Sequence, residues 1–444
     1  MNVFLWKMNG FLWGAPALAM ILTVGLFLSV RLRFVQLTLL PEALKQFAAG
    51  LRPGRKNSGF RALCTALAAT VGTGNLAGVA GAICLGGPGA IFWMWISGLL
   101  GMVTKYAEAV LSVRYRVQTA EGFLGGPMYV MEQRLGSRWK PMAVCYSIFG
   151  LAASFGIGNG AQINAAVTSF QVFLHGDARK NLLLGILLAG VIGALLFGGA
   201  ASIGKAAERL VPFAAAGYIL LCAGVLTARL SEIPQALSRI FLGAFSPRAV
   251  TGGMLGSGFQ ALRVGCSRGV FTNEAGMGTA GMAHSGADVP HPAQQGMMGI
   301  VEVFLDTIVI CTLTALVILT SGVDIPFGTD AGAELTQQAF QSVYGSLASV
   351  FLAMALCLFA VAAVLGWGMY GGRCAQYLFG QRAWKIYAGA QTMMVVAGAV
   401  LDTGLVWQLS EVLNGLMVIP NLITLAVLAP EVSRLTLDYR KSGR

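Results

Sequence analysis

The segment Thr70–Asn75, which reads TVGTGN, combines residue types that can bind a small charged ligand. Apolar residues 63–69 and 76–85 flank it, so the whole stretch is long enough to cross a bilayer. Glycine, threonine and asparagine are poor choices for uninterrupted helix there. Backbone groups freed in hydrocarbon need new partners, so we expect a broken helix lining a wet cavity near the membrane midplane, where it binds an ion or polar ligand. The alternative is a glycine-lined helix crossing without a ligand.

A second irregular stretch, residues 256–278, is rich in glycine and contains Arg263, Arg268 and Glu274. Ionisable groups within a membrane are costly, so they are usually paired or functional. Arg268 and Glu274 are therefore expected either to pair structurally or to act in gating. Glu302 and Asp306 lie four residues apart, on one helix face.

Other candidate ligand contacts lie on neighbouring spans. Asn159, Gln162 and Asn164 follow the interruption 156–160, and Trp367 stands in the sequence LGWG. This tryptophan is expected either in the interfacial aromatic belt or inside the bundle, closing over a ligand. Lys105 and Glu108 are expected to snorkel or to pair.

The composition is that of a polytopic membrane protein. Of the 444 residues, 56% are hydrophobic and 11% are charged, against about 25% charged in a soluble domain. We predict an all-α fold of eleven transmembrane helices. The predicted spans are 13–32, 60–86, 88–112, 141–173, 181–199, 204–228, 250–283, 293–321, 343–370, 384–401 and 405–429.

The positions of the basic residues predict the orientation. With the N-terminus outside and the C-terminus in the cytoplasm, most of the 30 lysines and arginines fall in cytoplasmic segments. This is the distribution expected of a membrane protein, so we predict that orientation. The two irregular spans each begin a set of five, and an odd set reverses direction, which predicts a five-plus-five inverted repeat. The predicted division is an extra N-terminal helix with a basic inner loop (1–59), a first repeat (60–229), a second repeat (250–429) and a cytoplasmic tail (430–444).

No catalytic or metal-ligand pattern stands out. The three histidines lack a clear nucleophile partner, and GxSxG, HExxH and Walker-type motifs are absent. The eight cysteines are scattered singly without CxxC spacing, which favours apolar packing. We therefore expect no enzyme activity, no cofactor and no nucleic-acid partner.

Several motifs resemble those of the alanine or glycine:cation symporter family. They occur in the family's order over most of residues 60–370: VGTGNLAGVA (71–80), GGPGAIFWMW (86–95), TKYAEA (104–109), GGPMY (125–129), NEAGMG (273–278) and DTIVICT (306–312). The resemblance implies a LeuT-type fold with one extra N-terminal helix, located in the plasma membrane of a bacterium or archaeon. It also implies import of small neutral amino acids, alanine or glycine, by Na⁺ symport through alternating access.

The resemblance also assigns roles to residues of this chain. Gly72, Thr73, Gly74 and Asn75 would bind the substrate's carboxylate at a half-helix N-terminus. Gln162 would be a substrate contact, Trp367 an aromatic lid, and the backbone from Gly265 to Ser267 would offer carbonyls to the ammonium group. The expected partners are thus a small neutral amino acid and membrane lipid.

One departure from the family puts the coupling ion in doubt. Members of that family usually carry serine or threonine where this chain has Ala362 and Ala363. In the LeuT-type fold, the hydroxyls of those residues bind Na⁺. The remaining candidate ligands are the backbone carbonyls of Ala68, Val71 and Phe359, and Na⁺ needs several oxygens. Three hypotheses follow: Na⁺ symport with an altered site, H⁺-coupled or Na⁺-independent transport or exchange, or a non-transporting amino-acid sensor. The sequence fixes neither the substrate nor the oligomeric state.

Overall fold

The computed structural model describes residues 2–52, 57–120, 122–174, 177–245, 258–329, 332–401 and 404–442, which are mostly helical. The N-terminal half comprises α1 (Asn2–Leu12), α2 (Ala15–Arg31), α3 (Val35–Thr38), α4 (Leu40–Gly50), α5 (Ser58–Thr70), the π-helix η1 (Gly74–Gly78), α6 (Val79–Gly86), α7 (Gly89–Arg114), strands β1 (Val117–Thr119) and β2 (Gly122–Leu124), α8 (Pro127–Val130), the π-helix η2 (Met131–Leu135), the 3-10 turn η3 (Ser137–Trp139), α9 (Lys140–Phe155), the π-helix η4 (Gly156–Gly160), α10 (Ala161–Leu174), α11 (Ala178–Phe197) and α12 (Gly199–Ala228).

The C-terminal half contains the two longest helices, α19 and α21. It comprises η5 (Leu230–Glu232), α13 (Ile233–Phe245), α14 (Gly258–Asn273), α15 (Thr279–His284), α16 (Pro292–Val303), the π-helix η6 (Phe304–Cys311), α17 (Thr312–Thr320), α18 (Ala333–Tyr344), α19 (Leu347–Phe379), α20 (Ala383–Val400) and α21 (Gly404–Ser442).

Eight helical segments of the described chain are long and apolar enough to cross a membrane, and a bent pair raises this number to nine. The pair is Ser58–Thr70 with Gly74–Gly86, whose axes differ by 56°. The break predicted within span 60–86 is therefore confirmed. The other eight segments are Lys7–Arg31, Gly89–Arg114, Ser137–Phe170, Ala178–Phe197, Gly199–Ala228, Pro292–Thr320, Leu347–Phe379 and Gln408–Ser442.

Two predicted spans are not among the segments that are long and apolar enough to cross a membrane. The first corresponds to α14 and α15, and α14 is less apolar because it carries Arg263 and Arg268; residues 250–257 of this prediction lie outside the described residues. The second corresponds to α20, which has 18 residues including Lys385 and Gln391. Eleven spans and the inverted repeat thus remain predictions.

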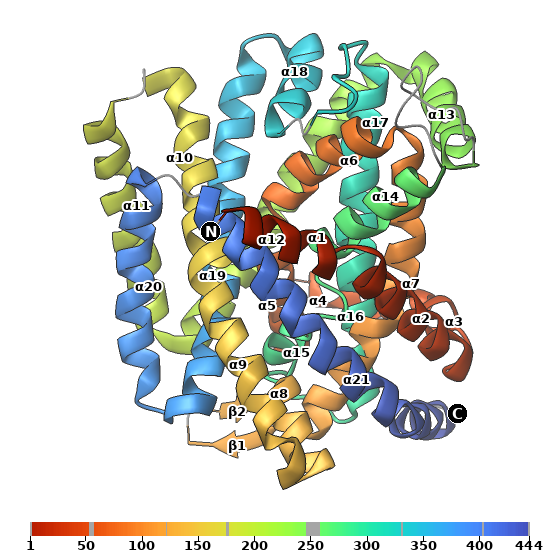
Figure 1. Cartoon of the computed structure of the whole chain (residues 1–444), viewed down its shortest axis with the longest axis vertical. Helices are drawn as coiled ribbons and strands as arrows, with labels where there is room; N and C mark the ends of the chain where they lie inside the picture. Colours follow the sequence, from red (N-terminus) through yellow and green to blue (C-terminus); the bar gives the residue numbers. More distant parts are fainter. Residues whose placement is uncertain are drawn as a thin grey trace.

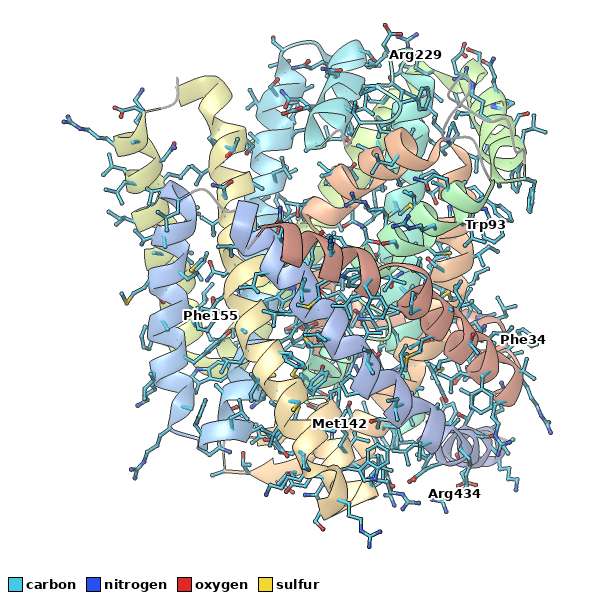
Figure 2. All side chains as sticks on the ribbon, viewed as in Figure 1. Phe34, Trp93, Met142, Phe155, Arg229 and Arg434 are labelled. Atoms are coloured by element: carbon cyan, nitrogen blue, oxygen red, sulfur yellow. The ribbon has the colours of Figure 1, made fainter. Side chains whose placement is uncertain are left out.

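The bundle places apolar side chains both inside and on its outer surface. On α12, Phe213 and Leu220 are each 71% exposed, and Ile386 of α20 is 79% exposed. Charged side chains such as Arg229 and Arg434 lie toward the two ends (Figure 2). This distribution is typical of a helix bundle in lipid.

The two ends of the bundle carry different structures (Figure 1). The amphipathic helices α13 and α18 lie at one end, and the antiparallel β1–β2 hairpin, α8 and the C-terminal end of α21 lie at the other. Between them, α14 and α16 both pack on α7, while α19 packs on α5, α9, α10 and α12. This packing brings α5, η1, α14 and α19 together around the middle of the molecule.

Candidate functional site

The first helix break leaves backbone donors at its centre. Helix α5 ends at Thr70, Val71 is extended (ψ 109°), and η1 begins at Gly74. Since the preceding chain is extended, the N–H groups of Thr73 and Gly74 have no carbonyl one helical turn earlier to accept their hydrogen bonds. They form the positive end of the η1–α6 half-helix, which suits an anion.

Asn75 is occupied by protein partners. Its Oδ1 accepts a 2.8 Å hydrogen bond from the backbone N–H of Gly72, and its Nδ2 donates to Oδ1 of Asp306, also at 2.8 Å. The side chain is fully buried. The prediction that Gly72 and Asn75 bind a substrate carboxylate therefore differs from the structure, in which the two residues cap each other and stabilise the break.

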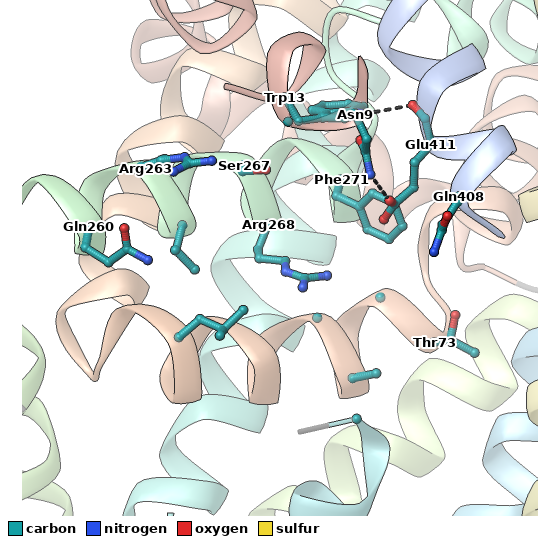
Figure 3. A pocket seen from close by; sticks show the side chains of 17 residues that line it. Asn9, Trp13, Thr73, Gln260, Arg263, Ser267, Arg268, Phe271, Gln408 and Glu411 are labelled. Atoms are coloured by element: carbon teal, nitrogen blue, oxygen red, sulfur yellow. Dashed lines mark hydrogen bonds between the residues drawn. The ribbon is translucent and has the colours of Figure 1, made fainter. Parts of the chain in front are cut away.

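A cavity of about 650 Å³ lies beside this break (Figure 3). Of the predicted site residues, Thr73, Gly74, Ser267 and Arg268 line it, whereas Gly72, Asn75, Gln162, Gly265 and Trp367 do not. The remaining lining residues are Asn9, Gly10, Trp13, Ala77, Gly78, Leu85, Gln260, Arg263, Val264, Phe271, Gly332, Gln408 and Glu411. The cavity therefore lies between η1–α6, α14, α1 and the start of α21.

The second break lies at the C-terminal end of the predicted stretch 256–278, after the segment expected to bind the ammonium group. Helix α14 is continuous through Gly265–Ser267, so their carbonyls accept helical hydrogen bonds and are not free for an ammonium group. Gly265 instead allows close packing, because a Cβ there would lie 2.2 Å from the carbonyl oxygen of Ala90 on α7. The chain leaves the helix after Asn273, with positive φ at Glu274 (55°), Gly276 (93°) and Gly278 (79°).

The second break is filled by Glu108 of α7. Its Oε1 accepts hydrogen bonds from the backbone N–H of Gly276 (2.9 Å) and of Gly278 (3.1 Å), and from Nδ2 of Asn421 (2.8 Å). Glu108 is 2% exposed, so it is buried and does not snorkel. A protein carboxylate thus occupies the anion site of this break, while the donors of the first break face the cavity.

Glu274 and Arg268 are on different surfaces. Glu274 is 5% exposed, and its Oε2 accepts from Oγ1 of Thr279 at 2.6 Å. Arg268 lines the cavity one turn and a half earlier in α14. The carboxylate of Glu274 thus bonds to the first residue of α15, directly after the break.

A chain of hydrogen bonds connects the two breaks through η6. Asp306 Oδ2 accepts from Thr307 Oγ1 (2.9 Å), and Thr307 Oγ1 accepts from Asn273 Nδ2 (3.0 Å). Asn273 Oδ1 in turn accepts from the backbone N–H of Ala275 at 2.9 Å. Since Asp306 also binds Asn75, the two breaks belong to one buried hydrogen-bond network.

Gln162 and Trp367 lie behind the first break. Oγ1 of Thr73 donates to Oε1 of Gln162 at 3.1 Å. Trp367 is 2% exposed and packs on Gly158 of η4, where a Cβ would come within 2.5 Å of the tryptophan side chain. Trp367 is therefore a residue of the bundle interior, and the alternative of an interfacial belt is wrong.

The candidate cation ligands lie where α5 meets α19. Ala68 is in the last turn of α5, and the N–H of Gly72, its normal helical partner, is bonded to Asn75, so the Ala68 carbonyl is left without that donor. A Cβ on Gly366 would lie 2.7 Å from the backbone N of Ala69, so the two helices are in backbone contact. Phe359, Ala362 and Ala363 are buried in continuous helix α19. Within the described ranges, no cluster of three His, Cys, Asp or Glu side chains could hold a metal.

A buried ionic cluster joins α7, α15 and α16. Nζ of Lys105 binds Oε1 of Glu302 at 2.8 Å, and Oε2 of Glu302 binds Nε2 of His284 at 2.9 Å. Gln295 completes the cluster by bonding to Nδ1 of His284 at 2.7 Å. The prediction that Lys105 pairs is confirmed, and its partner is on α16.

The contribution of the first helix to the cavity wall was not predicted from the sequence. Nδ2 of Asn9 hydrogen-bonds to Oε2 of Glu411, and Nε1 of Trp13 donates to the backbone oxygen of Glu411 at 2.8 Å (Figure 3). These contacts join α1 to α21 across one side of the cavity. The available signal was Glu411 itself, an acidic residue inside the predicted span 405–429.

A helix bundle with apolar outer surfaces, two interrupted helices and a polar cavity between them defines a membrane transporter of the LeuT type. The chain belongs to the sodium:alanine symporter family, whose model matches residues 1–444, so the resemblance is confirmed and the protein is a transporter and not an enzyme. It is 42% identical to the sodium/alanine symporter AgcS of Methanococcus maripaludis, with 95% of this chain and 93% of that one covered. It is 38% identical to the probable sodium/glutamine symporter GlnT of Bacillus subtilis, covering 98% and 91%.

Solved structures support the fold. The crystal structure of MhsT in complex with L-phenylalanine matches with a TM-score of 0.52 at 14% identity, covering 86% of this chain and 99% of that one. A manganese transporter of Eremococcus coleocola matches with a TM-score of 0.54 at 14% identity, covering 87% and 80%. At these identities the likeness is one of fold alone.

Proposed function

We propose that this protein imports small neutral amino acids, alanine or glycine, by Na⁺ symport through alternating access. The observation that carries the proposal is the difference between the two breaks. Glu108 fills the second break, whereas the N–H groups of Thr73 and Gly74 begin a half-helix beside the cavity. A substrate carboxylate on these donors would complete the first break as Glu108 completes the second.

The cavity wall supplies charges that suit a zwitterion. Arg263 and Arg268 on α14 attract the carboxylate, and Glu411 on α21 attracts the ammonium group. Ser267 adds a hydroxyl from α14. The names of the two relatives, which mention alanine and glutamine with sodium, favour this class of substrate.

Alternating access would use the bend between α5 and η1–α6. Because Asn75, Asp306, Thr307 and Asn273 form one hydrogen-bonded chain, both broken helices would move together. Gln162 would follow this movement because it binds Thr73, and Trp367 would follow it because the adjacent Gly366 is in contact with Ala69 of α5. We propose the N-terminus outside and the C-terminus in the cytoplasm of a bacterial or archaeal cell.

For Na⁺ we propose the junction of α5 and α19, with the carbonyls of Ala68 and Val71 at the end of α5 as ligands, joined by the second lone pair of the Phe359 carbonyl, whose first accepts the helical hydrogen bond of α19. Ala362 and Ala363 bring no hydroxyl to this junction, which favours a second candidate function: H⁺-coupled or Na⁺-independent transport. The buried Lys105–Glu302–His284 cluster offers protonatable groups for that alternative.

The deciding experiment is uptake of radiolabelled alanine by the full chain in liposomes. With an inward Na⁺ gradient we expect concentrative uptake that disappears when choline replaces Na⁺. Thr73→Val removes the hydroxyl that binds Gln162 and should raise the KM, while Asn164→Ala, which loses only contacts to the backbone of Gly398 and Leu401, serves as the control. Undiminished uptake in choline would overturn Na⁺ coupling, and no uptake of any small neutral amino acid would overturn the substrate class.

A further inference from the structure

A second cavity, of about 670 Å³, lies away from the transport site, between the α11–α12 turn and the α19–α20 turn. It is lined by Phe197, Gly198, Gly199, Ala200, Ala201, Arg373, Gln376, Gln381, Arg382, Trp384 and Lys385. The indole Nε1 of Trp384 donates to the backbone oxygen of Leu196 at 3.0 Å, which holds the two turns together. The cavity is thus built from two helix pairs that are far apart in sequence.

The lining is strongly positive. It includes Arg373, Arg382 and Lys385, and no acidic side chain is among its lining residues in the part of the chain that the structure describes. Arg373 is 6% exposed, and its Nη1 donates to Oε1 of Gln376 at 3.0 Å, so this guanidinium is fixed in the wall of the cavity. Arg382 and Lys385 are exposed at its mouth.

The N-terminus of α12 opens onto the same cavity. This helix has 30 residues, and its N-cap, Gly198, provides no side-chain hydrogen bond. The first N–H groups, those of Gly199, Ala200 and Ala201, are therefore uncapped by any side chain and add a positive helix end to the three cationic side chains. Backbone donors with arginine and lysine are the groups that bind phosphate in proteins.

The protein surface around the cavity is apolar. Acyl chains would pack on such a surface, whereas a soluble anion would make no use of it. Phe197 lines the cavity and is 55% exposed. Phe379 and Ile386, which neighbour the α19–α20 lining residues in sequence, are 72% and 79% exposed. The turn also lies at the end of the bundle that carries the β1–β2 hairpin (Figure 1), since Tyr377 donates to Oε2 of Glu132, in the π-helix that follows the hairpin, at 2.7 Å. This end also carries the C-terminus, so it faces the cytoplasm in the orientation proposed above, and basic pockets between transmembrane helices on the cytoplasmic side bind acidic lipid headgroups.

We propose that this cavity binds a phosphate group, and that an anionic phospholipid supplies it, with its acyl chains on the outer surface of α11 and α20. The headgroup phosphate lies between the α12 N-terminus and the side chains of Arg373, Arg382 and Lys385. Such a lipid joins the α11–α12 pair to the α19–α20 pair, and α19 also carries Trp367 of the transport site.

The test measures lipid binding directly and does not depend on transport. The probe is dioctanoyl phosphatidylglycerol, titrated into the purified full chain in detergent, with dioctanoyl phosphatidylcholine and inorganic phosphate as comparison ligands. The first variant, Arg382→Gln/Lys385→Gln, removes two exposed charges. The second, Ala201→Glu, places an acid in the first turn of α12, which favours the helix but repels an anion. A matched control, Lys45→Gln/Arg138→Gln, removes two exposed charges elsewhere.

We expect phosphatidylglycerol to bind the wild type and the control equally, and to bind both test variants about tenfold more weakly or worse. The charge-preserving variant Arg382→Lys/Lys385→Arg should keep binding within about threefold, which separates loss of charge from loss of fold. Equal binding to the wild type and Arg382→Gln/Lys385→Gln, or equal binding of phosphatidylcholine, would overturn the site. If inorganic phosphate binds as tightly as phosphatidylglycerol, the lipid source is overturned and a soluble anion takes its place.

Discussion

The side-chain amide of Asn75 donates a 2.8 Å hydrogen bond to the carboxylate of Asp306, 231 residues further along the chain. The other end of the same amide accepts from the N–H of Gly72. One neutral side chain thus satisfies a backbone donor of the first break and a buried carboxylate of η6 together. The stability of the break and the placement of Asp306 are therefore coupled.

This coupling predicts a non-additive pair of substitutions. Asn75→Ala leaves Asp306 and the Gly72 N–H without this partner, and should lower the free energy of unfolding by about 2–4 kcal/mol. Asp306→Ala should also destabilise, but the double variant should cost less than the sum by about 1–3 kcal/mol. Denaturation of the purified protein in detergent measures all three. Strict additivity would show that the two side chains act independently.

The buried ion pair of Lys105 and Glu302 predicts a large effect of removing one partner. Lys105→Met should destabilise by about 3–5 kcal/mol, because it leaves a buried carboxylate, and Lys105→Met/Glu302→Met should recover part of that loss. The control is Arg61→Gln, which breaks the partly exposed pair of Arg61 and Glu208 at 2.9 Å, and should cost less than about 1 kcal/mol. Equal losses for Lys105→Met and Arg61→Gln would contradict this interpretation.

Glu108 is predicted to hold the second break closed. In Glu108→Ala the N–H groups of Gly276 and Gly278 lose their acceptor, so their hydrogen exchange should accelerate by about ten- to a hundredfold. Glu108→Gln keeps an acceptor oxygen and should show a smaller increase. Exchange monitored by mass spectrometry on the peptide covering 274–279 makes the comparison. Unchanged protection in Glu108→Ala would mean that Asn421 and the packing suffice.

The alanines of α19 predict a gain of function. Ala362→Ser/Ala363→Ser adds hydroxyls one turn before Gly366, where α19 contacts α5, and should lower the Na⁺ concentration for half-maximal alanine uptake by about three- to tenfold. The matched control is Ala360→Ser, in the same helix but outside this pair. If uptake by the wild type and the double variant is equally indifferent to Na⁺, the H⁺-coupled alternative gains support.

The contact between α1 and α21 predicts a gate on one side of the cavity. Asn9→Ala removes a hydrogen bond to Glu411, and should increase the labelling rate of Ser267→Cys by a polar thiol reagent about fivefold, corresponding to about 1 kcal/mol. Asn164→Ala, whose partners lie near α20, should leave the rate unchanged. The same rate in all three backgrounds would mean that α1 does not limit access.

Local composition was sufficient to predict the first break but not to place the second. Residues 70–75 combine two glycines with two threonines and an asparagine inside an apolar run, and the other glycines of that run have apolar neighbours. In 256–278, Gly265 and Gly276 look alike in sequence, yet Gly265 permits contact with Ala90 and Gly276 adopts positive φ. Close approach and chain reversal both require glycine, and only the packing of α14 on α7 distinguishes them.

The partners of the buried charges could not be predicted, because the groups that meet are far apart along the chain. From the sequence, Lys105 and Glu108 are expected to snorkel or to pair, and Asp306 is expected on one helix face with Glu302. Their partners Glu302, Gly276 and Asn75 depend on how α7, α15, α16 and η1 pack in the bundle. A single sequence shows that each buried charge needs a partner, but it does not show which residue that partner is.

The separation of Lys105 and Glu302 by 197 residues has a consequence for biogenesis. Helix α7 leaves the ribosome and enters the bilayer long before α16 is synthesised, and a lone lysine at depth is disfavoured by about 2.5–3.5 kcal/mol. Glu108, on the same helix, likewise lacks its hydrogen-bond donor until Gly276 is synthesised. We therefore expect the early helices to stay at the insertion machinery, or in contact with water, until the second half of the chain is made, and we expect a chain truncated before α16 to be sensitive to proteolysis.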